Sequence, residues 1–109
     1  MKRGEVWTAP GGKGYTGKPR PVVIVQDDRF AATASVTVCP LTSDPTEAPL
    51  IRLPIEPSET NGLKARSRLM VDKITTMSRG QVRARLGVLS DDDLVRLNRA
   101  ALVFLGLAG

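Results

Sequence analysis

The residues with the clearest chemical potential lie around an arginine that stands between two prolines. Arg20 lies between Pro19 and Pro21 at the start of a run of β-branched residues, and proline on both sides restricts the backbone there. A guanidinium held in one place can bind a phosphate with two parallel hydrogen bonds and stabilise negative charge that develops on it. The same side chain could instead end a strand in solvent, and these few residues alone do not decide between the two.

Hydroxyl and carboxylate side chains follow at later points in the chain. Thr42 and Ser43 close an apolar run, where their hydroxyls could donate to phosphate oxygens or could simply start the turn that Asp44 encourages. Asp72 interrupts another apolar run. Its carboxylate could act as an acid or base, accept a hydrogen bond from a nucleobase, or pair with a nearby arginine.

The side chains that are missing narrow the range of reactions. The chain has no histidine and a single cysteine, Cys39, which excludes imidazole acid–base chemistry, a Cys–His nucleophile pair and an intrachain disulfide. Cys39 lies among apolar residues, so we expect a packed and unreactive thiol. The sequence also lacks the ligand combination of a zinc site, and we expect neither a metal nor a cofactor.

The charge balance favours an acidic partner. The net charge is +5, and eight of the sixteen Lys and Arg residues lie between Arg52 and Arg85 with only three acidic residues among them. Such an excess is typical of proteins that bind nucleic acid, an acidic protein or an anionic membrane. A merely solvated surface would give the same count.

Residues 10–19 form a loop rich in glycine, with two lysines and Tyr15. An aromatic ring in a basic loop can stack on an unpaired base. The loop lacks the Gly-Lys-Ser/Thr ending of a phosphate-binding loop and no helix pattern follows it, so a nucleotide triphosphate site is not expected.

The elements that must position these residues are mainly strands. Apolar patterning predicts strands at residues 4–9, 20–26, 35–41, 50–55, 67–74 and 81–89. The continuous run at 20–26 is typical of a strand buried on both faces. The run at 81–89 alternates with arginines and predicts a half-exposed strand, and Asn61–Gly62 predicts a turn.

A helix is expected at the C-terminal end. Ser90 can cap it, with three aspartates in the first turn where the positive end of the helix dipole stabilises anions, and Gly106 can end it. One stripe of apolar residues runs along the expected helix: Leu94, Leu97, Ala101, Leu102 and Leu105. This stripe could pack within one subunit or partly across an interface.

Together these elements predict one domain over residues 1–109, mainly β, with a strongly bent antiparallel sheet or barrel and a C-terminal helix. No apolar run approaches the roughly 18 residues that a bilayer span needs. No hydrophobic segment follows the basic N-terminus, which favours a cytoplasmic protein with no membrane association.

Five short motifs, in order and spacing, resemble the MazF/PemK family of toxins. They are RGEVW at residues 3–7, RPVVIVQ at 20–26, PLTS at 40–43, NGL at 61–63 and MVDKI at 70–74. The resemblance runs nearly end to end. It implies a small barrel of five to seven short strands, related to the SH3-like and CcdB folds, with a C-terminal helix.

The resemblance also implies an activity, partners and site residues. The family members are homodimeric, metal-independent endoribonucleases that cut single-stranded RNA at short sequences, messenger RNA first and transfer or ribosomal RNA as further substrates, and a MazE-type antitoxin occupies their RNA groove. The family's catalytic pair transfers to Arg20 and Thr42. The residues expected to contact RNA are Ser43, Asp72, Lys18, Thr16, Lys73 and Tyr15. Some members carry an arginine two residues before the aspartate, where this chain has Met70.

RNA chemistry is compatible with these residue types, because RNA carries its own nucleophile in the 2′-hydroxyl. The protein has only to align that group, stabilise charge on the phosphate and assist proton transfer, leaving a cyclic phosphate and a 5′-hydroxyl. Two alternatives remain: a non-enzymatic CcdB-like toxin that inhibits DNA gyrase, and a basic RNA-binding barrel without activity.

Overall fold

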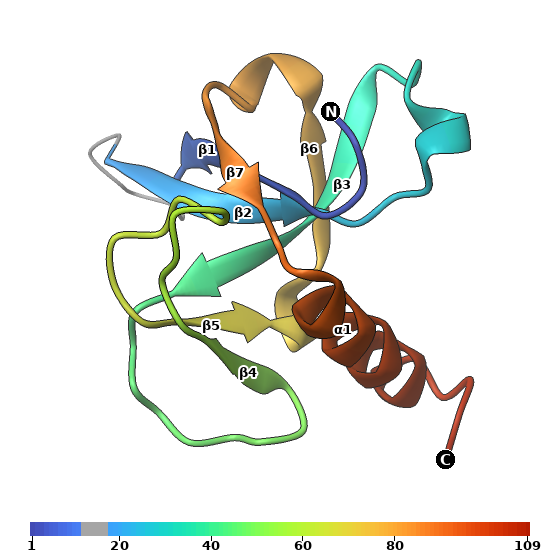
Figure 1. The fold of residues 1–109 in the computed structure, drawn as a ribbon. Coiled ribbons are helices and arrows are strands. Elements are labelled where there is room, and N and C mark those ends of the chain that lie inside the picture. Colours follow the sequence, from blue (N-terminus) through green and yellow to red (C-terminus); the bar gives the residue numbers. More distant parts are fainter. Residues whose placement is uncertain (12–17) are drawn as a thin grey trace.

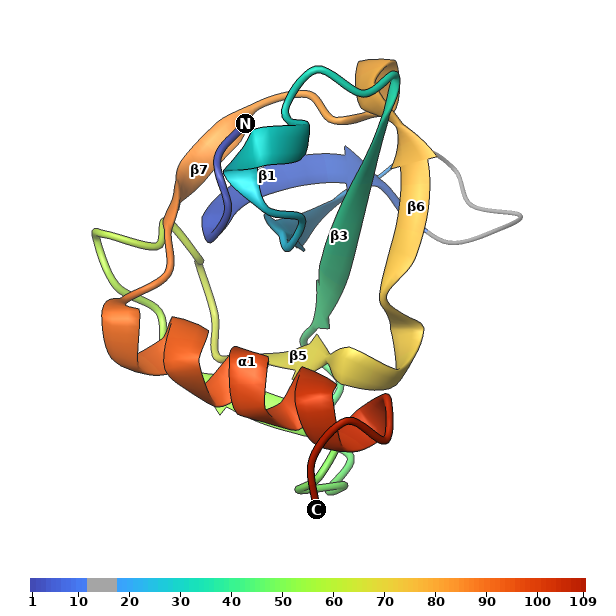
Figure 2. The same ribbon diagram turned by 90° about the vertical axis from the view of Figure 1, so that its right-hand side faces the viewer.

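The computed structural model describes residues 1–11 and 18–109. Within them, seven antiparallel strands form one curled sheet and a helix runs across its open end (Figures 1 and 2). The strands are β1 (Glu5–Pro10), β2 (Pro19–Ile24), β3 (Ser35–Thr42), β4 (Arg52–Ile55), β5 (Ser67–Met70), β6 (Thr75–Ser78) and β7 (Arg85–Val88). Helix α1 spans Asp91–Phe104, and three 3₁₀ turns are η1 (Asp28–Phe30), η2 (Val71–Lys73) and η3 (Arg79–Gln81).

Strand β3 is the centre of the sheet. The hydrogen-bonded order is β4-β5-β3-β2-β1-β7, with β6 also pairing with β3. One edge of β3 pairs with β2, through Val22 opposite Pro40, and β3 also pairs with β5 and then β6. The mainly β fold with a C-terminal helix is therefore confirmed, and the strands follow one another in antiparallel pairs.

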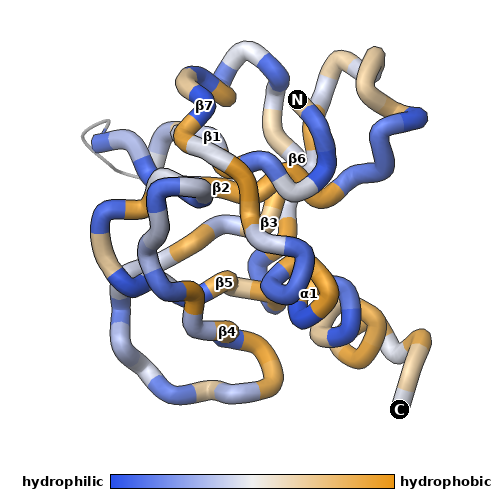
Figure 3. The backbone as a smooth tube through the Cα atoms, viewed as in Figure 1, coloured by the Kyte–Doolittle hydropathy of each residue, from blue (hydrophilic) through white to orange (hydrophobic). Residues whose placement is uncertain are grey.

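Two apolar clusters fill the two faces of the curl. The larger lies between the sheet and α1, and includes Val23, Leu41, Leu69 and Leu97. The smaller one contains Ala9, Val22, Ile24, Val36, Val38 and Val82. Val22, Val23 and Ile24 of β2 enter opposite clusters in turn, which confirms burial on both faces for this part of the strand, whereas Pro19 and Arg20 are exposed. Figure 3 shows the hydrophobic segments along these strands.

The strand expected at residues 67–74 is wrong in its second half, because β5 ends at Met70, η2 follows it and β6 begins only at Thr75. Leu41 pairs with Leu69 and Val38 pairs with Thr75. A step of three residues along β3 therefore corresponds to a step of six residues along the neighbouring segment. The turn η2 takes up the three extra residues, so Asp72 lies in a turn rather than in a strand.

The expected strand at residues 81–89 is also shorter than predicted. Only β7, Arg85–Val88, is regular, while η3 precedes it. Val82 is buried between them, and its burial continues the apolar alternation that suggested a longer strand. The β1–β7 register shifts between Val6 and Trp7, and beyond this irregularity Thr8 still makes backbone hydrogen bonds with Ala84 and Arg83.

Helix α1 begins and ends as predicted, but half of its apolar stripe is exposed. The Asp93 N–H donates to Ser90 Oγ at 3.1 Å. Gly106 has φ +76°, and the Leu107 N–H donates to the Leu102 carbonyl at 2.8 Å, which completes a Schellman-type end. Leu97 is buried, whereas Leu102 and Leu105 are 44% and 64% exposed. Across the described residues, no helix has the length and hydropathy to cross a membrane.

Candidate functional site

The strand register brings together the two residues predicted to be catalytic. Val22 of β2 lies opposite Pro40 of β3, and the same register continued by two residues sets Arg20 across from Thr42. Both side chains line one cavity of about 560 Å³. Prolines on both sides of Arg20 fix its backbone at the start of the strand.

The cavity combines one apolar lining with a small set of polar groups. Its polar and charged residues are Arg20, Thr42, Lys73, Thr75 and Gln81. Two methionines, Met70 and Met77, belong to the apolar part. Met77 packs against the smaller cluster, and both methionines are only partly buried. An apolar pocket with a few convergent polar groups is the usual form of a ligand site.

The hydroxyl of Thr42 is oriented by the loop that follows it. The Asp44 N–H donates to Thr42 Oγ1 at 3.1 Å, and the Asp44 carboxylate accepts from the Thr46 hydroxyl at 2.7 Å and from the Thr46 N–H at 2.9 Å. These hydrogen bonds from Thr46 lower the pKa of Asp44. A threonine hydroxyl that accepts one hydrogen bond still has its own proton to donate.

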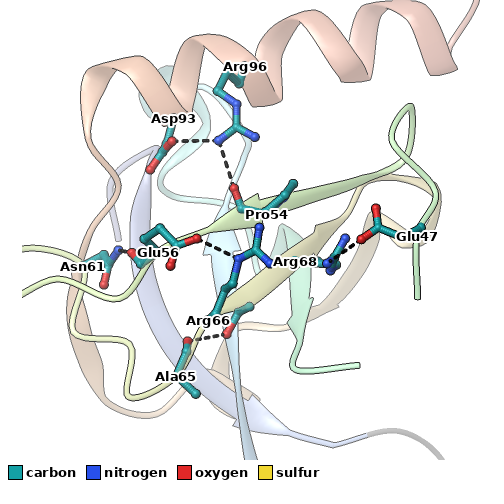
Figure 4. A network of polar contacts seen from close by, with 10 residues as sticks. Glu47, Pro54, Glu56, Asn61, Ala65, Arg66, Arg68, Asp93 and Arg96 are labelled. Atoms are coloured by element: carbon teal, nitrogen blue, oxygen red, sulfur yellow. Dashed lines mark hydrogen bonds and ion pairs between the residues drawn. The ribbon is translucent and has the colours of Figure 1, made fainter. Parts of the chain in front are cut away.

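A buried arginine holds the far end of the same loop. Arg68 lies opposite Thr42 in the β3–β5 pair and is only 6% exposed. Its guanidinium pairs with Glu47 at 3.1 Å (Figure 4). Thr42 is therefore restrained both by its pairing with β5 and by the loop that follows it.

Asp72 pairs with an arginine, which is one of the roles that its sequence left open. Arg52 Nε and Nη2 donate to the two carboxylate oxygens of Asp72, each at 3.0 Å. These hydrogen bonds lower the pKa of Asp72. The pair ties β4 to η2, and the next residue along that turn, Lys73, lines the cavity.

Cys39 is a packed thiol, as expected. Its side chain is fully buried in the larger apolar cluster, and burial raises its pKa to about 12. In the part of the chain that the structure describes, no three His, Cys, Asp or Glu side chains gather closely enough to hold a metal ion.

A second cavity, of about 480 Å³, lies beside the first and shares Arg20 and Leu41 with it. Lys18 and Ser43, two of the expected RNA contacts, line this second cavity rather than the first. Its other residues come from β1, β2, the β4–β5 loop, the start of β5 and β7, and include Leu63, Lys64 and Leu86.

The predicted site residues thus divide between two neighbouring cavities. Thr42 and Lys73 line the first, Lys18 and Ser43 the second, and Arg20 lines both. Asp72 lines neither and faces Arg52 instead. Thr16 and Tyr15 lie outside the described residues.

Sequence reasoning missed several polar residues that line the cavities: Thr75, Gln81 and Lys64. Thr75 begins β6, just after the 3₁₀ turn η2, and Gln81 is the last residue of η3. Neither turn was predicted. Lys64 directly follows the NGL motif. Its position next to a tight turn was the only signal that could have identified it.

Half of the eight basic side chains between residues 52 and 85 are paired with acidic side chains. Four of the arginines form ion pairs: Arg52 with Asp72, Arg66 with Glu56, Arg68 with Glu47 and Arg85 with Glu5. Among residues 1–11 and 18–109 we find no ion pair for Lys64 or Lys73. Each of these two lysines lines one of the cavities, whereas Arg79 and Arg83 line neither, so Lys64 and Lys73 bring the positive charge of this segment to the cavities that Arg20 also lines.

Comparison with known proteins gives a consistent result. The profile of the family described as PemK-like, MazF-like toxin of type II toxin-antitoxin system matches residues 2–105. The chain is 56% identical, over 100% of both chains, to a protein of Mycolicibacterium smegmatis named probable endoribonuclease MazF.

Solved structures share the fold. An endoribonuclease from a mycobacterial species, in complex with its cognate antitoxin, superposes with a TM-score of 0.82 at 24% identity and covers 100% of this chain and 98% of that one. MazF-mt6, a toxin of Mycobacterium tuberculosis, superposes with a TM-score of 0.79 at 22% identity and covers 96% of this chain and 99% of that one. A MazE–MazF structure from Deinococcus radiodurans superposes with a TM-score of 0.78 at 19% identity and covers 99% of this chain and 97% of that one.

Proposed function

The chain belongs to the PemK-like, MazF-like toxin family of type II toxin-antitoxin systems and is an endoribonuclease of that family, and from this premise we propose how it cuts RNA. The substrate is single-stranded messenger RNA, with unpaired transfer or ribosomal RNA as further targets. Cleavage occurs in the cavity that Arg20, Thr42 and Lys73 line. The reaction takes place in the cytoplasm and uses no metal.

The observation that carries this proposal is the convergence of Arg20 and Thr42 on one cavity from two adjacent strands. Arg20 binds the scissile phosphate through its guanidinium, which matches the geometry of phosphate oxygens. Thr42 donates a hydrogen bond to the same phosphate and keeps it in register. Lys73 adds a second positive charge in a cavity where Met70 stands in place of the arginine of other members.

The cleavage step transfers the phosphoryl group within the RNA. The 2′-oxygen attacks the adjacent phosphorus, the bond from phosphorus to the 5′-oxygen breaks, the 2′-hydroxyl loses its proton and the 5′-oxygen gains one. The products are a 2′,3′-cyclic phosphate and a 5′-hydroxyl. Negative charge grows on the equatorial phosphate oxygens, and a fixed arginine beside them lowers the barrier because it stabilises the transition state more than the ground state.

Partners follow from the same family membership. One of the solved structures that share this fold holds a cognate antitoxin, and we infer that a MazE-type antitoxin inhibits this chain by covering the cavity at Arg20. We also infer a homodimer. The apolar side chains at the end of α1, from Leu102 to Leu105 and at Leu107, are exposed in the single chain, and a second copy would bury them.

The test is cleavage of a long unstructured RNA by the purified protein in excess EDTA, with Arg20→Ala beside it and the new ends mapped. We expect the parent to cut and to leave cyclic-phosphate and 5′-hydroxyl ends. We expect Arg20→Ala to lose at least about 100-fold in rate. Since Arg20 is exposed, the variant should fold, which circular dichroism checks.

Intact RNA with the parent protein would contradict this proposal. If the parent then inhibited DNA supercoiling, the CcdB-like alternative would replace it. If RNA bound without being cut, and Arg20→Ala only weakened that binding, the chain would be an RNA-binding barrel without activity.

A further inference from the structure

We propose that the second cavity binds the nucleobase next to the scissile phosphate and so contributes to the choice of cleavage sequence. The inference rests on the proposed function, because it needs the phosphate at Arg20. Lys18 and Ser43 were expected to contact RNA, but no base-binding role was expected for the rest of the lining, and Arg20 is the only residue expected to be catalytic among the lining residues that the structure describes.

The position of the cavity relative to Arg20 is the first argument. The two cavities share Arg20 and Leu41, so a phosphate bound to Arg20 lies next to both cavities. An RNA strand that crosses Arg20 therefore brings the nucleotides before and after the cut to different cavities. Enzymes that act on single-stranded RNA read such splayed bases one by one.

The lining of the second cavity has the chemistry of a base pocket. Pro21, Leu41, Leu63 and Leu86 give apolar surfaces for the faces of a base, and flipped bases are commonly held between apolar or aromatic side chains. The Ser43 hydroxyl lines the same space and can donate to or accept from a base edge. A volume of about 480 Å³ lies within the usual range for a small-ligand site, roughly 300–1,000 Å³.

One wall of this cavity is preformed by a network around Asn61, which is only 3% exposed. Asn61 Oδ1 accepts from the N–H groups of Ser58 and Leu63, at 3.0 and 2.9 Å. Its Nδ2 donates to the Glu56 carbonyl at 2.9 Å (Figure 4). The Asn61 N–H in turn donates to Ser58 Oγ at 3.0 Å. A loop fixed in this way holds its shape before a ligand arrives, which lowers the entropic cost of binding.

Two glycines let this loop lie directly on β7. A Cβ at Gly62, where φ is +70°, would sit 2.1 Å from the Leu86 carbonyl oxygen, and a Cβ at Gly87 would sit 2.2 Å from the Thr60 carbonyl oxygen. The Val88 N–H donates to that Thr60 carbonyl at 2.9 Å. The close packing sets Leu63 and Lys64 beside Leu86 in the cavity lining.

The charges at this cavity suit a nucleotide rather than an apolar peptide. Lys18, Arg20 and Lys64 contribute positive charge to its lining, and none of the lining residues that the structure describes is acidic. Lysine side chains next to an apolar pocket bind the phosphates on either side of a buried base. The ligand of the second cavity is therefore a nucleobase together with its flanking phosphate.

The experiment compares cleavage profiles of the parent and Ala65→Trp on a pool of randomised single-stranded RNA, with every new end sequenced. Ala65 lines the second cavity, does not line the first, and is exposed, so an indole there fills the space with little effect on the core. We expect the base preference to change at one position beside the cut and at no other. Cleavage of the parent's best sequence should fall at least about tenfold.

Ala32→Trp is the matched control, because Ala32 is exposed and lines neither cavity, and its profile should equal the parent's. If the parent cuts and Ala65→Trp keeps the parent's base preference at every position, the proposal that the second cavity binds a base is wrong. If the parent does not cut at all, the proposed function fails instead.

A second variant tests the lysine separately. With Lys64→Ala, the slope of log kcat/KM against log salt should become shallower by about 0.7, the value of one phosphate contact on a single strand. Lys2→Ala, an exposed lysine that lines neither cavity, should leave the slope unchanged. An unchanged slope with Lys64→Ala would remove Lys64 from the RNA-binding surface.

Discussion

At the scale of single residues, Thr42 combines a half-buried strand position with a hydroxyl that the Asp44 N–H already orients. Thr42→Val keeps the shape and removes the hydroxyl, so we expect the rate of RNA cleavage to fall by about 100-fold. Thr42→Ser should keep most of the rate. Thr76→Val on β6, where the threonine is exposed and lines neither cavity, should behave as the parent. Equal rates for Thr42→Val and the parent would remove Thr42 from the mechanism.

The Arg52–Asp72 pair gives a pH-dependent prediction of stability. Arg52 lowers the pKa of Asp72 in the folded chain, below the unfolded value of about 3.9. The pair therefore stabilises the fold above that value, and its contribution is lost as the pH falls through the folded pKa. We expect Asp72→Asn to lower the free energy of unfolding by about 2 kcal/mol near pH 7.

Urea unfolding at several pH values checks this prediction. The difference between the parent and Asp72→Asn should be full near neutral pH and should shrink below about pH 4. Glu59→Gln removes an exposed carboxylate and should change little at any pH. A difference for Asp72→Asn that is the same at pH 7 and pH 3 would show that packing, rather than charge, explains the loss.

At the scale of elements, the contact between the β4–β5 loop and β7 depends on glycine. Gly62→Ala must place a Cβ against the Leu86 carbonyl in a left-handed backbone conformation, so we expect a loss of about 3 kcal/mol of stability. Gly80→Ala is the control, because its Cβ would meet only Ser78 Oγ at 3.8 Å. Thermal unfolding measures both, and a Gly62→Ala variant as stable as Gly80→Ala would contradict the close packing.

Elements whose signals are local could be predicted from the sequence, and those set by strand register could not. The burial of β2 and the cap of α1 at Ser90 depend on neighbouring residues and were confirmed. The turn η2 depends on how β3 pairs with two later strands, which periodicity does not report. The apolar run from Ser67 to Ile74 therefore suggested one strand, although three of its residues form a turn.

The same distinction applies to the candidate site. Arg20 and Thr42 stand at strand ends marked by proline and by a turn, so their places at the ends of neighbouring strands could be predicted from local signals, while their catalytic roles stay a prediction that the family resemblance supplied. The partner of Asp72 could not, because Arg52 reaches it only through the β4–β5 pair, in which Arg52 lies opposite Met70. Lys64 was missed for a similar reason, since its loop meets the cavity only through contact with β7.

At the scale of the whole molecule, the exposed apolar end of α1 predicts an assembly. Phe104, Leu105 and Leu107 are 49%, 64% and 71% exposed, and we expect Leu105→Lys to shift the molecular mass in solution from dimer towards monomer. A cation suits the C-terminal end of a helix, so the variant should still fold. Light scattering over a range of concentrations measures the mass.

Leu50→Lys is the control for the assembly. Leu50 is 75% exposed in the loop between β3 and β4, away from α1 in the sequence, and its replacement should leave the mass unchanged. If Leu105→Lys has the same mass as the parent at every concentration, α1 does not form the dimer interface.

The buried thiol of Cys39 has a practical consequence for labelling. Its side chain has no exposed surface and burial raises its pKa to about 12, whereas maleimides react with an accessible thiolate. A cysteine introduced at an exposed position, such as Ala32→Cys, would therefore carry a fluorophore or spin label alone, with the native cysteine left in place. The chain is in effect already a cysteine-free background for spectroscopy.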